Sequence, residues 1–395
     1  MADRGDTGEA GSPAGGSSRW AGGWWEPVGL YVAAATLLGA LAVARHPRGW
    51  PGFVEAVRGA AGDYLVTATV GYPQGTWRLA TFPGFAMAIR GTSEVVPGLD
   101  VAGAAVLLAA LGGALTALTV WWWCGTRGMP DTARRWAVLA LLASPAAFVL
   151  LDNPQSEAIY LPAVFGACVA VERRRPGLAA AFLVVASITR LTAVLFAVVL
   201  VVRIWEQDGV LTPVADRLRP NWDGARLAVR QFVPLLGAAG AVAFLLYTWR
   251  VHGSPLVFFR EQSALIPSGP RWHPATWAHW GLVQRAGDLW ASPGYLVETV
   301  TNLTFIGLCA WSTPAVRRRF GDAYALLVVG HVVMVWFLAY NFTSTSRYLL
   351  GVLPVFAWAG LRLAERRRVA FVVLAGSAAV MLWFGSVFPN GVALA

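Results

Sequence analysis

The stretch Trp50-Pro51-Gly52-Phe53-Val54-Glu55-Ala56-Val57-Arg58, followed by Gly62-Asp63-Tyr64, lies inside a long connection between two hydrophobic segments. This connection runs from residue 46 to residue 100. Long connections that are not disordered are usually functional, and apolar residues recur at helical spacing on both sides of a Gly-Tyr-Pro turn at 71–73. The pattern predicts two short amphipathic helices in the membrane interface, joined by this turn. Their apolar faces are Phe53, Val54, Val57, Ala60 and Ala61, and then Leu79, Phe82, Ala86 and Ile89.

The composition is that of a membrane protein. Of 395 residues, 57% are hydrophobic and 13% are charged, whereas soluble domains carry about 25% charged residues. The net charge is +10, but the arginines cluster in short loops, and no basic domain stands clear of the membrane. Nucleic-acid binding is therefore a poor interpretation. The three cysteines have no metal-like spacing, so we predict neither a disulfide framework nor a metal site.

Hydrophobic segments predict an all-α polytopic membrane protein with about ten transmembrane helices and a long outer first loop that carries amphipathic helices. Residues 1–24 are polar and predict a disordered cytoplasmic N-terminus, and residues 25–390 predict a single transmembrane domain with outer loops 46–100 and 252–294. The predicted segments are 27–44, 101–123, 136–151, 158–171, 178–202, 232–251, 295–313, 323–340, 348–363 and 369–388.

Arginine clusters predict the orientation of these segments. Clusters at 134–135, 173–175, 317–319 and 366–368 flank hydrophobic segments, and the positive-inside rule places them in the cytoplasm. The N-terminus is then cytoplasmic and both long loops are extracytoplasmic, and we expect the protein in the plasma membrane.

Segment 178–202 tests this scheme because basic residues flank both of its ends. It is too short for two full crossings at 1.5 Å per residue. We predict two half-helices that meet at Thr189-Arg190, which is tolerated where the break lines a polar cavity. The alternative is one ordinary span, which would leave a basic loop outside.

Several polar side chains gather on the predicted outer side, and Arg190 is the sharpest case. It is the single charge between residues 178 and 202, so we expect it to face a cavity or to pair with Glu157; the two roles are compatible. An outer-loop carboxylate, deep arginines and interfacial helices suit sugar transfer from a lipid phosphate. The leaving phosphate needs a cation, and the acceptor hydroxyl needs one base.

Short motifs in the same order resemble the integral-membrane glycosyltransferases of the GT-C class, and most closely the PIG-V-like mannosyltransferases. They are Asp63-Tyr64 with Gly71-Tyr72, Thr81-Phe82-Pro83-Gly84-Phe85, Ser156-Glu157, Ser187 to Thr192, Gly253 to Leu256 with Phe258 and Gln262, and Ser346-Arg347-Tyr348 with Pro354. The resemblance implies inverting transfer of a sugar, mannose above all, from a polyprenyl-phosphate donor. It implies membrane lipids and a glycan, lipid or protein acceptor as partners, and no further cofactor. With the outer polar groups, it gives Tyr64, Tyr72, Arg78, Glu157, Thr189, Arg190, Gln262, Arg347 and Tyr348 as substrate-binding candidates.

The sequence differs from the family pattern at the position of the catalytic base. The family typically has an Asp four residues before the tyrosine that matches Tyr64, where this chain has Ala60. Asp63 and Glu55 are the two candidate catalytic carboxylates, and we favour Asp63 because Glu55 has Arg58 one helical turn away. The alternative is an inactive GT-C-fold protein that binds a lipid or a partner enzyme. A transporter would predict a repeat of broken helices, and the sequence has one break.

Overall fold

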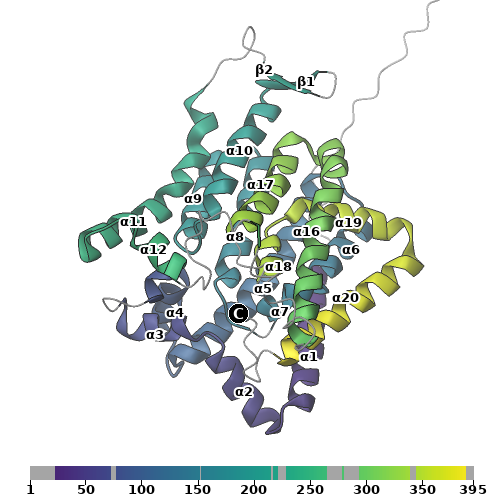
Figure 1. Ribbon diagram of the computed structural model, residues 1–395. Coiled ribbons are helices and arrows are strands. Elements are labelled where there is room, and N and C mark those ends of the chain that lie inside the picture. The colour runs from purple at the N-terminus through teal and green to yellow at the C-terminus, as the bar shows by residue number, and fades with distance from the viewer. Residues whose placement is uncertain are drawn as a thin grey trace, which may run out of the picture.

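The computed structural model describes residues 23–72, 77–151, 153–214, 217–220, 228–264, 278–279, 293–338 and 344–387. Helices dominate this part of the chain (Figure 1). Residues 1–22 of the predicted N-terminal segment, and most of the predicted outer loop 252–294, lie outside it. The α-helices are α1 (Trp25–Arg45), α2 (Gly49–Gly59), α3 (Asp63–Val70), α4 (Gly84–Val95), α5 (Val101–Thr126), α6 (Asp131–Leu142), α7 (Phe148–Leu151), α8 (Glu157–Glu172), α9 (Pro176–Ser187), α10 (Ala193–Gln207), α11 (Ala239–His252), α12 (Val257–Ala264), α16 (Pro293–Phe320), α17 (Asp322–Leu338), α18 (Thr345–Leu349), α19 (Leu353–Glu365) and α20 (Arg367–Val387).

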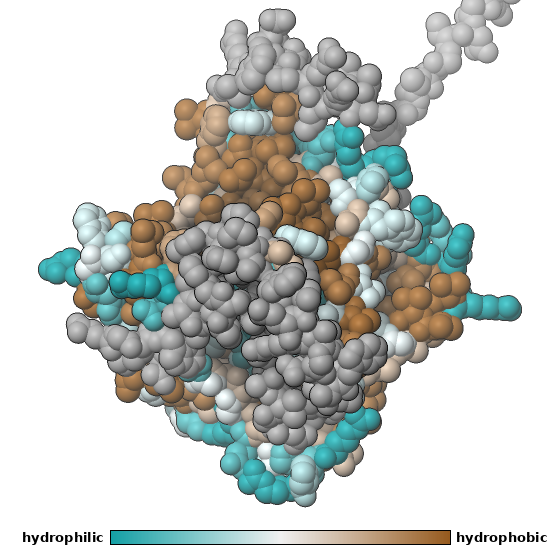
Figure 2. Space-filling view, in the orientation of Figure 1, coloured by the Kyte–Doolittle hydropathy of each residue, from teal (hydrophilic) through white to brown (hydrophobic). Residues whose placement is uncertain are grey.

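The all-α polytopic architecture is confirmed, although few of its helices are long, straight spans. Among the described residues, four helices are long and apolar enough to cross a membrane: Trp25–Arg45, Val101–Thr126, Val229–His252 and Arg367–Gly385. The predicted segment 136–151 is instead a pair bent by 71°, formed by α6 and by residues 145–151. Figure 2 shows hydrophobic residues over the upper middle of one face and hydrophilic residues at its lower end, where α2 lies.

Three α-helices and a 3-10 turn, η1 (Trp77–Ala80), form the described part of the long first loop. The prediction of two helices was therefore wrong, because Gly62 turns the chain with a φ of +41° and ends the first run. The predicted apolar positions are nevertheless largely buried. Phe53 and Val57 pack with Ala42 of α1, and Ile89 packs in a second cluster with Ala61 of the α2–α3 corner.

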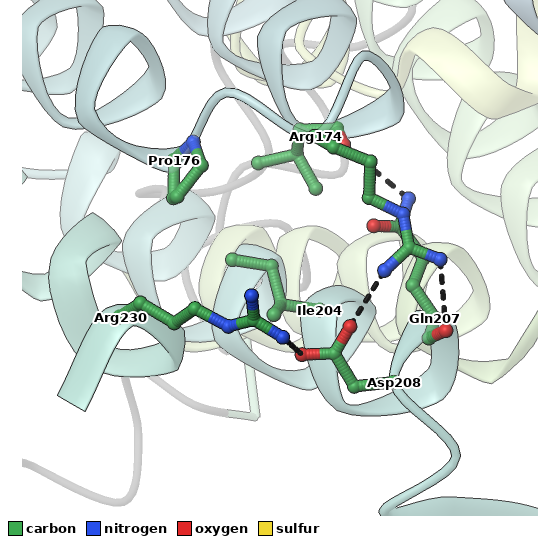
Figure 3. A pocket seen from close by; sticks show the side chains of 7 residues that line it. Arg174, Pro176, Ile204, Gln207, Asp208 and Arg230 are labelled. Atoms are coloured by element: carbon green, nitrogen blue, oxygen red, sulfur yellow. Dashed lines mark hydrogen bonds and ion pairs between the residues drawn. The ribbon is translucent and has the colours of Figure 1, made fainter. Parts of the chain in front are cut away.

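The predicted break at Thr189-Arg190 is confirmed, since α9 ends at Ser187 and α10 begins at Ala193. The two ends of this pair that lie away from the break, the start of α9 and the end of α10, are side by side. Arg174, before α9, donates to Asp208, after α10, at 2.6 Å, and Arg230 lies 3.6 Å from the same carboxylate (Figure 3). The chain therefore returns to the side from which it entered, and the one-span alternative was wrong.

Besides the helices, the described residues include one short antiparallel hairpin, formed by β1 (Leu211–Val214) and β2 (Arg217–Pro220). They follow α10, and η3 (Val229–Ala238) then leads into α11. In Figure 1 this hairpin lies at the opposite end of the molecule from α2. An ion pair between Glu26 at the start of α1 and Arg135 at the start of α6 joins the N-terminal end to one predicted cytoplasmic arginine cluster.

Close helix packing sets the position of the region around residue 157. A Cβ on Gly112 of α5 would lie 1.9 Å from the carbonyl oxygen of Ala158 on α8, so only glycine permits this approach. Glu157, the first residue of α8, precedes Ala158 directly and is buried beside this contact. Backbone proximity between α5 and α8 thus fixes where this carboxylate lies.

Candidate active site

A cavity of about 490 Å³ lies where the first-loop helices meet the bundle. Segments distant in sequence form its wall: 60–64, 80–82, 155–156, 189–192, 195, 258–259, 334–335 and 347–348. Gly84 brings two of these segments together, because its N–H donates to the carbonyl of Ile188 at 2.8 Å. A Cβ at Gly84 would lie 2.6 Å from the side chain of Thr189, so the α4 start needs glycine here.

Two arginines of this wall share one buried carboxylate, Glu157, which does not itself line the cavity. Arg190 Nη1 lies 2.6 Å from Glu157 Oε1, and Arg347 donates from Nε to the same oxygen at 3.1 Å and from Nη2 to Oε2 at 3.3 Å. Glu157 is fully buried, whereas the arginine side chains are 14% and 22% exposed. The predicted Arg190–Glu157 ion pair is therefore confirmed. The three side chains together carry a net charge of +1 beside the cavity.

Aromatic rings and an amide fix the two guanidinium groups. The Arg190 guanidinium lies 4.9 Å from the ring centre of Tyr348 and 5.5 Å from that of Tyr160, both distances suited to cation–π attraction. Arg347 also donates to Gln155 Oε1 at 3.3 Å, and Gln155 Nε2 donates in turn to the carbonyl of Ala60 at 2.9 Å. Gln155 thus links the arginine side of the cavity to the α2–α3 corner.

That corner carries Asp63 and Tyr64 into the same wall. Asp63 is the first residue of α3 and is half-buried. Tyr64 packs edge-on against Phe85 with ring centres 5.1 Å apart. Burial raises the pKa of the Tyr64 hydroxyl, although a hydrogen bond with Ser156 and the charge of Arg190 act in the opposite direction. The hydroxyl therefore keeps its proton at neutral pH and can donate a hydrogen bond.

Glu55, the other predicted carboxylate, lies outside the wall. Its side chain is 68% exposed and pairs with Arg48 at 2.9 Å. The expected pairing with Arg58 was wrong, because Arg58 instead pairs with Asp100 at the start of α5. Ala60, at the position of the family carboxylate, does line the cavity, and Asp63 follows it in the same wall.

The remaining predicted substrate-binding residues differ in where they lie. Thr189 and Tyr348 line the cavity as expected. Tyr72 lies outside the wall, because its hydroxyl donates to the carbonyl of Thr81 at 2.9 Å and its ring packs against Phe244. It supports the wall residue Thr81, and its role in substrate binding stays a prediction. The side chains of Arg78 and Gln262 lie outside the described part of the chain.

Several wall residues were missed as site candidates. The aromatic side of the cavity consists of Phe82, Phe258 and Phe259, with Phe82 and Phe258 in edge-on contact at 4.8 Å. Gln155 and Ser156 precede Glu157 directly, so their position in the same turn was the signal that pointed to them. The aromatic residues gave no such signal, because a phenylalanine in a hydrophobic chain is ordinarily a packing residue.

Residues 81–206 match the family model of glycosyltransferase family 87, a membrane family of the GT-C type. The matched region includes the wall segments 81–82, 155–156, 189–192 and 195, and it includes Glu157. It supports a membrane glycosyltransferase and does not confirm the closer resemblance to PIG-V-like enzymes. No curated protein matches the sequence.

Proposed function

We propose that this protein transfers a sugar, mannose in the first instance, from a polyprenyl-phosphate donor to an acceptor hydroxyl with inversion at the anomeric carbon. The observation that carries the proposal is that Arg190 and Arg347, which share the buried Glu157, line a cavity that Asp63 also lines. Such a wall offers a cationic site and a carboxylate to one bound substrate. A glycan, a lipid or a protein can supply the acceptor hydroxyl.

The two arginines are suited to a lipid phosphate. One carboxylate neutralises only one of the two guanidinium groups, and arginine stays protonated at any physiological pH. As the glycosidic bond breaks, negative charge grows on the leaving phosphate oxygen, and fixed guanidinium donors stabilise that charge. Partial burial strengthens this effect, because the surrounding dielectric is lower than that of water.

Asp63 serves as the general base in this proposal. The acceptor oxygen attacks the anomeric carbon from the face opposite the phosphate, and its proton passes to the Asp63 carboxylate. The bond between the anomeric carbon and the phosphate oxygen breaks, and the lipid phosphate leaves with the electron pair. One carboxylate is sufficient, because a phosphate leaves without protonation by an acid.

The apolar part of the wall fits the lipid portion of the donor. Leu195 of α10 and Met334 and Val335 of α17 line the cavity, and these two helices pack against each other. A polyprenyl chain can follow this apolar surface into the bilayer while its phosphate meets the arginines. The proposal places the active site on the extracytoplasmic side of the plasma membrane, with a cytoplasmic N-terminus.

The experiment is transfer by the purified protein from polyprenyl-phosphate mannose to a panel of glycan, lipid and peptide acceptors. Asp63→Asn is expected to lower the rate by about 10²- to 10⁴-fold, the contribution of a general base. Glu55→Gln is the matched control, because its carboxylate is exposed and lies outside the wall, and it is expected to leave the rate unchanged. Full activity of Asp63→Asn would remove Asp63 from the mechanism.

Donor binding is tested separately with undecaprenyl phosphate. Arg190→Gln is expected to weaken binding of this lipid in a folded protein. A protein that shows no transfer with several lipid-linked sugars, yet binds undecaprenyl phosphate through Arg190, would instead be the non-catalytic lipid-binding form of the fold. The Ala60 position, which lacks the carboxylate of the resembled family, is the feature that favours this second function.

A further inference from the structure

Helix α16 carries two buried polar side chains that the proposed chemistry does not use. Glu298 is 7% exposed and Asn302 is 1% exposed, and neither lines the cavity. They are four residues apart, so they lie on one face of the helix, one turn from each other. Helix α18, which carries Arg347, packs against α16.

Both side chains accept backbone hydrogen bonds from the start of α18. The N–H of Ser344 donates to Glu298 Oε1 at 3.1 Å, and the N–H of Ser346 donates to Asn302 Oδ1 at 3.0 Å. The first N–H groups of a helix have no partner within the helix. Two of these donors are therefore satisfied by side chains that are 46 and 44 residues away in the sequence.

The backbone at this point adopts a conformation that needs support. Ser344 has a φ of +55°, in the left-handed region that residues other than glycine rarely adopt. Such a conformation persists where surrounding contacts hold it, and it occurs preferentially at functional sites. The carbonyl of Ser344 accepts a hydrogen bond from the N–H of Arg347 at 3.1 Å, so Ser344 and Arg347 belong to the same turn.

A local cap by the Ser344 side chain could satisfy the N–H of Ser346, but not that of Ser344 itself. Serine is a favourable N-cap residue, yet the Ser344 side chain makes no capping hydrogen bond. The acceptors come instead from a distant helix, and one of them is a buried carboxylate, which costs free energy to bury. This arrangement fixes α18 relative to α16, which a local cap would not do.

We propose that Glu298 and Asn302 are positioning residues that hold Arg347, through the backbone of Ser344 and Ser346, where it meets the lipid phosphate. The inference rests on the proposed function, in which Arg347 binds that phosphate. Arg347 donates to both oxygens of Glu157 and to Gln155, so its guanidinium has one well-defined place. A shift of α18 would break these contacts and move the cation away from the phosphate.

The test measures binding of undecaprenyl phosphate and the kinetics of transfer in paired variants. Glu298→Leu removes the acceptor and is expected to weaken binding and raise the donor KM about tenfold, within the range for coupled neighbours. The acceptor KM is expected to stay unchanged. Glu298→Gln keeps an acceptor oxygen and is expected to restore donor binding. Thr304→Val on the exposed side of the same helix is the matched control.

A double-mutant cycle separates positioning from general stability. In an Arg347→Gln background, Glu298→Leu is expected to have no further effect on phosphate binding, because the positioned group is gone. Additive losses would overturn the inference, since they would assign Glu298 a role independent of Arg347. Should Glu298→Leu yield no folded protein, Asn302→Leu takes its place in the cycle. Unchanged phosphate binding by folded Asn302→Leu would also overturn the inference.

The outcomes also distinguish this inference from the proposed function. A protein without transferase activity whose phosphate binding depends on both Arg347 and Glu298 would support the positioning role and refute the enzymatic one. An active enzyme whose Glu298→Leu variant binds the donor normally would support the enzymatic function and refute the positioning role. Absence of any undecaprenyl phosphate binding by the unmodified protein would overturn the inference directly.

Discussion

Gln155→Glu is the most informative single change at this site, because it replaces an amide by a carboxylate and so removes a hydrogen-bond donor and adds a negative charge. Gln155 accepts from Arg347 through Oε1 and donates to the carbonyl of Ala60 through Nε2. A carboxylate can still accept from Arg347 but cannot donate to Ala60. It also cancels the net charge of +1 that the two arginines and Glu157 give to the wall.

The magnitude follows from the distances. The new carboxylate would lie 3.3 Å from Arg347 Nη2, as the amide oxygen does now. A phosphate on the far side of that guanidinium would be about 6 Å from it, where unit charges repel by about 0.7 kcal/mol in water and about 3 kcal/mol in the effective dielectric of a protein. We therefore expect undecaprenyl phosphate to bind roughly 3- to 100-fold more weakly.

The assay is equilibrium binding of undecaprenyl phosphate to the purified protein in nanodiscs. Gln155→Met loses the hydrogen bonds with Arg347, Ala60 and Asn153 without adding charge, so it separates the electrostatic effect from the loss of these contacts. Thr69→Glu, an added carboxylate at an exposed position of α3, controls for charge elsewhere on the outer helices. Binding by Gln155→Glu as tight as that of the unmodified protein would refute the assignment of this wall to the phosphate.

Two further predictions concern packing and orientation. Gly84→Ala should lower the Tm and the transfer rate, because overpacking costs about 1–3 kcal/mol. Gly91→Ala on the same helix has open space around it, so it should leave the transfer rate unchanged and should not lower the Tm, since alanine favours a helix more than glycine does. Equal Tm values for the two variants would contradict the close-approach argument. The three native cysteines are buried, so labelling by an impermeant maleimide outside the cell reports on introduced cysteines. Val95→Cys and Leu256→Cys should react with this reagent, and Arg368→Cys should not. Labelling of only one of the two outer positions would refute the prediction that both loops lie on the outer side.

Much of the architecture was predictable from local patterns. Continuous hydrophobic segments predicted the helical membrane fold, since no other structure satisfies backbone hydrogen bonds in lipid as simply. Basic residues at both ends of segment 178–202 predicted its broken course, and the Arg174–Asp208 pair confirms it. A lone arginine in an apolar segment needs a counter-charge, so the pairing of Arg190 with Glu157 was also predictable.

Helix boundaries and the interior of the first loop were not predictable in the same way. Hydropathy reports that a segment is apolar, but not that α6 and α7 bend by 71° or that Gly62 divides one amphipathic run into two helices. These features depend on a backbone conformation at single residues. The predicted apolar positions are nevertheless largely buried, because the apolar spacing is retained on both sides of such a turn.

The choice among candidate site residues depended on tertiary structure. The sequence favoured Asp63 over Glu55, but only the packing of the α2–α3 corner puts Asp63 in the cavity wall and leaves Glu55 against Arg48 in solvent. Glu298 and Asn302 lie in a helix whose sequence gives no sign of Arg347. Hydrophobic segments are encoded by neighbours in the chain, whereas a site is assembled from residues that only the fold brings together.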